Sequence, residues 1–143
     1  MKNDLTVRDL LPDEVEPVRL FLGQNGWSHR TGSSDDFAQL IENSQRTAVA
    51  LSGEQIIGFA RGITDGLSNG YLSMVVVDDQ HRRAGVGRAL VEHLMGDNPE
   101  ITWVLRAGRE GAEAFFASLG FATSVIAMER PRITFDSKDP STQ

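Results

Sequence analysis

Residues 71–90 hold the part of the chain best suited to chemistry. An apolar, β-branched stretch from Met74 to Val77 stops at two aspartates, and a basic glycine turn follows at residues 82–88. The spacing of apolar residues then becomes helical, with Val86, Leu90, His93 and Leu94 on one face. A strand, a glycine turn and a helix start direct several backbone N–H groups and the helix dipole at one point. The pattern predicts a pyrophosphate-binding site.

The side chains of this turn suit a bulky anion. Gly85 and Gly87 allow the backbone to come close to a ligand. Arg82, Arg83 and Arg88 concentrate positive charge in a chain whose net charge is −6. Basic residues at a helix start oppose the helix dipole, so their presence there favours a bound anion over a purely structural role.

Composition excludes several other classes of function. A chain of 143 residues with 40% hydrophobic and 24% charged residues is most simply one globular domain. The acidic balance argues against a nucleic-acid binder. The absence of cysteine and the scatter of only three histidines argue against a metal site. No 18-residue apolar stretch and no apolar secretory core are present, so we expect no membrane segment and a cytoplasmic location.

Hydrophobic spacing predicts the elements that position this turn. A loop is expected at 23–32 and a polar tail at 131–143. Asp13 and Glu16 resemble a capping box for the first helix, Ser33 or Ser34 caps the second, Asn98-Pro99 ends the third and Gly120 ends the fourth. Strands are expected at 5–8, 47–51, 55–63, 71–77, 101–105 and 124–130, and helices after Asp13, after Ser33, from Val86 and over 111–119.

This order predicts an α/β fold built on a mixed sheet. Three strands joined by tight turns form an antiparallel meander, and the strand–helix–strand unit over 71–105 adds a parallel pair with a right-handed crossover. Helices then cover both faces of the sheet. We expect one domain over residues 1–130, followed by the tail 131–143.

Three motifs in this order resemble the GCN5-related N-acetyltransferase (GNAT) family over residues 4–130. They are Val75-x-Val77-Asp78, then Arg82-x-x-Gly85-x-Gly87, then Ala112-x-x-Phe115-Phe116-x-x-Leu119-Gly120-Phe121. The resemblance implies a GNAT-like domain with splayed fourth and fifth strands and acetyl-CoA as cosubstrate. It also implies an N-acetyltransferase in which a primary amine attacks directly in a ternary complex.

The resemblance also implies where acetyl-CoA binds. The N–H groups of residues 83–88 hold the pyrophosphate, and the backbone of residues 75–77 pairs with the pantetheine amides. One N–H near Val75 or Val76 faces the thioester carbonyl, and losing such a donor typically costs about 3 kcal/mol. The candidate cofactor-binding residues are Val75, Val76, Val77, Arg82, Arg83, Ala84, Gly85, Val86, Gly87 and Arg88.

No catalytic side chain is assigned. Phe116 stands where the family often has the tyrosine that protonates the leaving thiolate, and Arg109 stands where it often has asparagine. We expect a base relayed through solvent, with His29, Asp65 and Asp78 as the alternative candidates. Trp27 and His29 are candidates for the acceptor pocket, against a simple packing role for the tryptophan.

Two alternatives stay open at this point. One is a GNAT-fold module that binds acyl-CoA without turnover. The other is a dinucleotide-binding domain, in which Leu90 occupies the place of a third glycine and Arg106 would meet a 2′-phosphate. The acceptor is a small-molecule or peptide amine, and the acidic balance favours a cationic one. The edge strand 124–130 is a candidate for pairing two copies in a homodimer, and a monomer is equally open.

Overall fold

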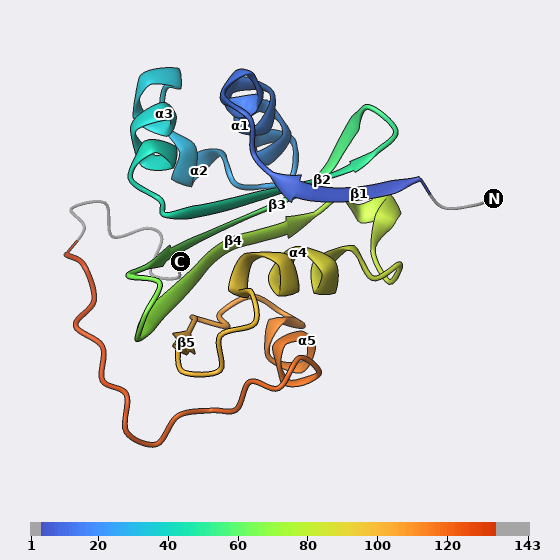
Figure 1. Cartoon of the computed structure of the whole chain (residues 1–143). Helices are drawn as coiled ribbons and strands as arrows, with labels where there is room; N and C mark the ends of the chain where they lie inside the picture. Colours follow the sequence, from blue (N-terminus) through green and yellow to red (C-terminus); the bar gives the residue numbers. More distant parts are fainter. Residues whose placement is uncertain (1–3, 134–143) are drawn as a thin grey trace. The chain divides into compact units, whose positions relative to one another are not determined.

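Five strands lie side by side in chain order in one sheet, as the computed structural model shows for residues 4–133 (Figure 1). The first three contacts between neighbours are antiparallel, and the last, between β4 and β5, is parallel. This confirms the predicted meander followed by a parallel strand–helix–strand unit. The strands are β1 (Leu5–Asp9), β2 (Arg46–Ser52), β3 (Gln55–Thr64), β4 (Asn69–Val77) and β5 (Thr102–Val104).

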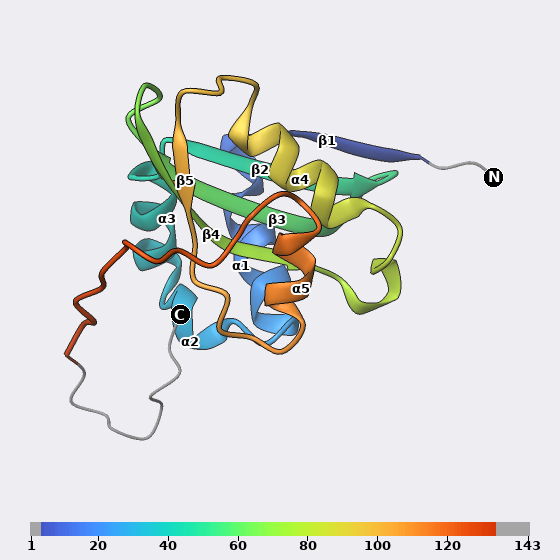
Figure 2. The same ribbon diagram turned by 90° about the horizontal axis from the view of Figure 1, so that it is seen from below.

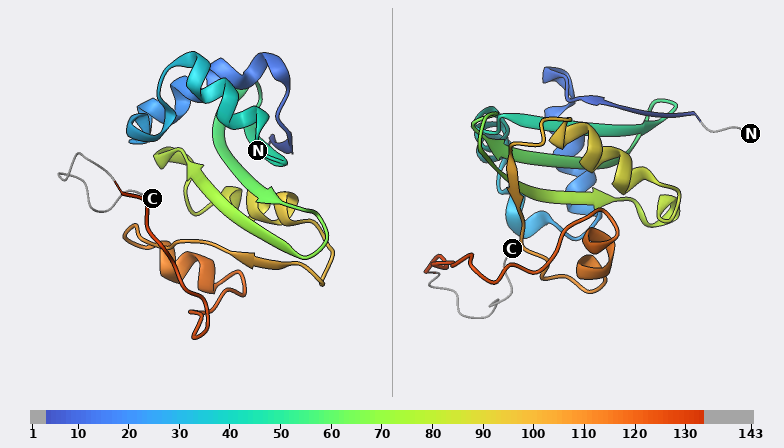
Figure 3. Two further views of the ribbon diagram at one scale, coloured as in Figure 1. Left: turned by 90° about the vertical axis from the view of Figure 1, so that its left-hand side faces the viewer. Right: turned by 60° about the horizontal axis from the view of Figure 1, so that its bottom comes forward.

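Helices cover both faces of this sheet, as predicted (Figure 3). Helices α1 (Val15–Gln24), α2 (Ser28–Thr31) and α3 (Ser34–Glu42) lie on one face, and α4 (Val86–Met95) lies on the other. The first face is closed by a buried cluster that includes Val18 and Leu22 of α1, Phe37 of α3 and Phe59 of β3. The rings of Phe37 and Phe59 lie 6.4 Å apart.

Small residues of β3 let α4 lie close to the sheet, where it crosses β2 and β3 (Figure 2). A Cβ atom at Gly58 would come within 2.9 Å of Leu90, and one at Gly62 within 3.0 Å of Leu94. Both leucines are almost fully buried, whereas His93, which the spacing places on the same helical face, is a surface residue. His93 is exposed and contacts Asp9, with 2.8 Å between Nε2 and Oδ1.

The helix starts differ in detail from the prediction. Helix α1 follows a short 3-10 turn at Pro12–Glu14, and the predicted cap at Asp13 is wrong. Glu14 caps the start of this turn instead. Its carboxylate accepts the N–H of Leu11 at 2.8 Å and pairs with Arg8 at 2.6 Å. This pairing lowers the pKa of Glu14. The cap of α3 is Ser33, whose Oγ accepts the N–H of Asp36 at 3.1 Å.

The chain divides into two units, residues 1–105 and 106–143. The described part of the second unit contains α5 (Ala112–Ala117), with Gly120 in the left-handed region (φ +99°) just after it, as predicted. Phe121 N–H returns to the carbonyl of Phe116 at 3.1 Å, which satisfies the end of the helix. Phe116 packs edge-to-face against Phe115 and Phe121, with centroids 4.8 and 5.7 Å away.

The strand predicted at residues 124–130 is wrong. These residues carry no strand and are exposed, with Val125 at 95% and Met128 at 96%. A strand needs a partner for its backbone ladder, and none of the described residues of the second unit forms one. Ser124 instead holds a turn, in which its Oγ accepts the N–H of Ala127 at 2.9 Å. The proposed pairing of two copies through this segment therefore loses its basis. Residues 134–143 of the predicted tail lie outside the described residues.

Candidate functional site

Strand β4 contains a bulge that the sequence did not predict. Phe59 of β3 pairs with Val76, yet Arg61 pairs with Ser73, so β4 has one extra residue between these two pairs. Met74 absorbs it with a φ of +57°, an unusual value for a residue with a side chain. A bulge bends its strand and interrupts the ladder, and this one lies in the middle of the predicted acetyl-CoA strand.

The edge of β4 beyond the bulge is open toward β5. Among residues 4–133, Asn69, Gly70 and Tyr71 are the residues of β4 that pair with β5, so the two strands separate after Tyr71. The separation agrees with the splay expected of the fold. Asp78 donates its N–H to Ile57 on the β3 side at 2.9 Å. Since backbone directions alternate along a strand, the N–H groups of Val77 and Val75 point to the opposite, open edge.

The turn that follows is built on two left-handed residues. Gly85 precedes α4 with a φ of +82°, and a Cβ added there would meet no atom within 4 Å. Arg83 has a φ of +67°, which the sequence did not predict. No side chain caps α4, and its first backbone bond runs from Ala89 N–H to Gly85 C=O at 3.0 Å. The N–H groups of Val86, Gly87 and Arg88 therefore come before the helical ladder begins.

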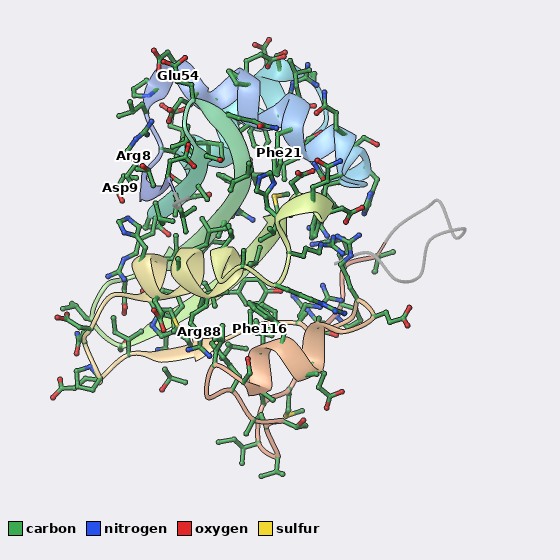
Figure 4. All side chains as sticks on the ribbon, turned by 90° about the vertical axis from the view of Figure 1, so that its right-hand side faces the viewer. Arg8, Asp9, Phe21, Glu54, Arg88 and Phe116 are labelled. Carbon is green, nitrogen blue, oxygen red and sulfur yellow. The ribbon has the colours of Figure 1, made fainter. Side chains whose placement is uncertain are left out.

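The charged side chains near this turn are exposed. Arg82 contacts Asp79 at 3.1 Å with 63% of its side chain exposed, and Arg88 contacts Glu92 at 3.3 Å with 52% exposed. Exposed ion pairs of this kind contribute little to stability, so exchanging either carboxylate partner for a bound anion costs little. Figure 4 marks Arg88 on α4 and Phe21 on α1, on opposite sides of the strands.

The structure brings the ten candidate cofactor residues to one end of the sheet. Val75–Val77 end β4, a single 3-10 turn at Asp79–His81 follows, and Arg82–Arg88 run into α4. The chemistry of this junction suits a phosphorylated ligand with an amide-bearing arm. It offers backbone donors in sequence: an open strand edge first, then a helix start without a capping side chain.

The two candidate acceptor residues lie in a different part of the same unit. The predicted loop 23–32 is wrong in part, because α1 continues to Gln24 and α2 occupies Ser28–Thr31. Trp27 belongs to the buried cluster, with 5% exposed, while His29 is exposed. Their rings are stacked with centroids 6.3 Å apart. The tryptophan thus packs on the core and supports the exposed histidine.

The other candidate bases are engaged in local structure. Asp65 accepts N–H groups from Leu67, Ser68 and Asn69 and the Ser68 hydroxyl, the last at 2.6 Å. The Ser68 hydroxyl and these amides hold the pKa of Asp65 well below its usual range, which makes it a poor base. Asp78 contacts His81 at 3.0 Å.

One polar residue that the sequence analysis passed over is buried in β3. Arg61 is 7% exposed, and its Nε donates to Ser44 Oγ at 2.9 Å. It pairs in register with Ser73, directly before the bulge. In the sequence, Arg61 is the one charged residue within the otherwise uncharged segment 56–63, and this feature could have indicated its burial.

Two polar side chains of the second unit have partners within that unit. Ser118 Oγ donates to the Phe115 carbonyl at 2.6 Å, and Arg106 pairs with Glu129 at 2.7 Å. The antiparallel meander also rules out the dinucleotide-binding alternative, which requires a doubly wound parallel sheet.

Two other kinds of site are absent from residues 4–133. Within that range, no three acidic or histidine side chains gather closely enough to ligate a metal ion. None of the helices in the same range has the length and apolarity needed to span a membrane.

Comparison with known proteins gives one consistent family. The sequence model of the acetyltransferase (GNAT) domain matches residues 43–123. The ribosomal protein bS18-alanine N-acetyltransferase of Escherichia coli (strain K12) is 30% identical over 110 residues, which span 70% of this chain and 67% of that protein. The PanD regulatory factor of Salmonella typhimurium is 33% identical over 95 residues, 63% of this chain and 74% of that protein.

The fold has close counterparts among solved structures. A protein of unknown function from methicillin-resistant Staphylococcus aureus superposes with a TM-score of 0.74 at 17% identity, covering 92% of this chain and 99% of that one. At this identity the likeness concerns the fold alone.

Proposed function

Because the chain belongs to the GNAT acetyltransferase family, we propose that it transfers an acetyl group from acetyl-CoA to a primary amine. In this proposal the amine attacks directly while both substrates are bound. The observation that carries it is the junction of β4 with α4. There an open strand edge leads into a helix start whose N-cap, Gly85, leaves free space where a side chain would stand.

The residues at this junction fit the parts of acetyl-CoA in order. The N–H groups of residues 83–88 bind the pyrophosphate, with Arg82, Arg83 and Arg88 adding charge. The open-edge N–H of Val77 pairs with a pantetheine amide, as an added strand would. The bound thioester supplies an activated acetyl group. The N–H of Val75, which points to the open edge beside the bulge, stabilises the negative charge that develops on the carbonyl oxygen, a contribution of about 3 kcal/mol.

Proton transfer in this proposal runs through solvent. Phe116 has no proton to donate, and the carboxylate of Asp65 accepts hydrogen bonds from the N–H and hydroxyl groups of Ser68 in its own turn. A coenzyme A thiolate is a tolerable leaving group, so water can serve in place of a side-chain acid. His29 is exposed and Asp78 is paired with His81, and both stay candidates for a base. The acceptor is a small-molecule or peptide amine.

The test compares Gly85→Asp with Gly85→Asn. Both side chains tolerate the left-handed conformation better than most and have nearly the same size, so the pair differs by one negative charge. Two like charges about 5 Å apart at an effective dielectric constant of about 20 repel by about 3 kcal/mol. Allowing for solvent at this exposed turn, we expect acetyl-CoA to bind at least tenfold more weakly to Gly85→Asp in calorimetry.

Acetyl-pantetheine provides the matched ligand, because it lacks the pyrophosphate. The two variants should bind it equally. Equal affinity of both variants for acetyl-CoA itself would refute the assignment of this turn to the pyrophosphate.

Two observations favour a second candidate, an acyl-CoA-binding module without turnover. The first is Phe116 in place of a proton-donating tyrosine. The second is the similarity to a relative named as a regulatory factor of PanD. Release of free thiol from acetyl-CoA over a panel of amines distinguishes the two candidates. Binding of acetyl-CoA without release of thiol above the uncatalysed rate would favour the module.

A further inference from the structure

Arg61 carries a buried positive charge for which residues 4–133 offer no counter-ion. Its one hydrogen bond within residues 4–133 is to the neutral hydroxyl of Ser44, at 2.9 Å, and no Asp or Glu of that range pairs with it. A guanidinium has five N–H donors. Its Nη atoms make no hydrogen bond within the described chain, and they are not sealed from solvent. Burying a charge without compensation is costly, and these unpaired N–H donors, which reach solvent, are the groups that an anionic ligand could bind.

A second arginine adds to this charge. Burial, followed by the nearby Arg30 of α2, lowers the pKa of Arg61, while Tyr71 acts in the opposite direction. The guanidinium groups of Arg30 and Arg61 therefore lie within electrostatic reach of each other. Because arginine stays protonated in proteins, the two charges persist, and together they create a local positive potential in an acidic protein.

This charge lies next to the place where the reaction would occur. Arg61 pairs with Ser73, and the bulge at Met74 follows immediately. Neighbouring strands are about 4.8 Å apart, and residues along a strand about 3.3 Å. Arg61 points to the face that carries α1–α3, since it bonds Ser44 just after α3. An acceptor whose amine approaches the bulge from this face would place a group a few bonds away near Arg61.

We propose that the acceptor amine carries an anionic group, a carboxylate or a phosphate, a few bonds from its nitrogen, and that Arg61 binds this group with Arg30 adding charge. The inference rests on the proposed acetyl transfer and narrows its substrate class. It revises the expectation of a cationic acceptor, which was drawn from net charge alone. The planar guanidinium suits both carboxylate and phosphate, because it can donate two parallel hydrogen bonds to either.

The test uses pairs of amines that differ only in the anionic group. Ethanolamine is compared with O-phosphoethanolamine, and β-alaninamide with β-alanine, by free-thiol release from acetyl-CoA. We expect kcat/KM to be at least tenfold higher for the anionic member of one pair, and the pair that responds identifies phosphate or carboxylate. In Arg61→Met, the ratio of kcat/KM for the anionic amine to that for the neutral amine should fall at least tenfold. The kcat/KM for the neutral amines should change less than twofold.

Two further variants control for charge and structure. Arg19→Met removes the same charge from an arginine that pairs with Glu16 on α1 at 2.7 Å, and it should keep the preference. Arg61→Lys keeps the positive charge but loses the paired N–H donors of the guanidinium, so it should retain part of the preference for the anionic amine. Without ligand, Arg61→Met should melt no lower than wild type, because an uncompensated buried charge is replaced by an apolar chain.

A binding measurement separates failure of this inference from failure of the proposed function. With CoA present, the anionic amines should raise the Tm of wild type and not of Arg61→Met. If acetyl-CoA binds and amines are acetylated with equal efficiency in each pair, the anion site is refuted and the transferase stands. If acetyl-CoA does not bind, the proposed function fails first. A large loss of Tm in Arg61→Met would show a structural arginine and would also overturn the inference.

Discussion

Substituting Gly70 by alanine should destabilise the protein, although glycine-to-alanine changes in regular structure usually do the opposite. Gly70 of β4 pairs in register with Trp103 of β5. An added Cβ would lie 2.5 Å from Cε3 and 2.7 Å from Cη2 of the indole. Carbon atoms pack at about 3.5–4.0 Å, so the ring would have to move by about 1 Å.

The indole has little freedom to make that movement. Trp103 also lies against Gly62, where a Cβ would be 3.5 Å from Cζ3, and the guanidinium of Arg46 stacks over its ring at 5.7 Å. Arg46 is itself fixed by hydrogen bonds of 2.9 Å to the carbonyls of Leu94 and Met95 at the end of α4. Overpacking of this kind costs about 1–3 kcal/mol.

Thermal unfolding of the full chain measures the effect. At about 4 °C per kcal/mol for a chain of this size, the Tm of Gly70→Ala should fall by about 4–12 °C. Gly23→Ala is the matched control, because Gly23 lies in α1 and an added Cβ there meets nothing within 4 Å. That variant should gain about 0.5–1 kcal/mol and melt higher. A Gly70→Ala variant as stable as wild type would refute the packing of Trp103 on this glycine.

Three further predictions concern the turn, a helix cap and the aromatic cluster. The hydrogen bonds that lower the pKa of Asp65 stabilise the fold at pH values above about 4, the pKa of this group in the unfolded chain. This stability is lost as the pH falls toward the lower pKa of the folded state. Between about pH 4 and pH 2, urea titrations of Asp65→Asn should therefore show a smaller loss of stability than those of wild type. Ser33→Ala removes the cap of α3 and should cost about 1 kcal/mol in urea unfolding, whereas Ser33→Asp should keep most of it; an unchanged midpoint in Ser33→Ala would contradict the cap. Phe116→Tyr keeps a half-buried ring, so we expect the same Tm and acetyl transfer at least as fast as wild type; a large drop in Tm would place the ring in a sealed apolar core.

Sequence periodicity predicted the elements whose burial is set locally. Val18, Phe21 and Leu22 form the buried stripe of α1, and Phe37 is buried in α3, as their spacing indicated. Turn residues predicted the β2–β3 hairpin at Ser52–Gln55 for the same reason. Such patterns can be predicted because a helix or hairpin buries one face whatever lies beyond it.

The features that were missed depend on distant parts of the chain. The bulge at Met74 follows from how β4 fits β3, and a methionine does not itself favour a positive φ. The segment 124–130 has the β-branched residues of a strand, but strand formation needs a partner that local sequence cannot supply.

In the proposed substrate class, the bulge and the buried arginine outweigh the net charge of the chain in selecting the acceptor. The charge of −6 is spread over a whole chain, whereas recognition takes place within a few ångströms of the bond that forms. In that small region the structure shows a buried guanidinium, a second arginine nearby and a tyrosine on the adjacent strand. A cationic acceptor would meet like charge there at low dielectric, where repulsion is strongest. The acidic surface can still attract a zwitterionic amine through its ammonium group, leaving the anionic end to select the site.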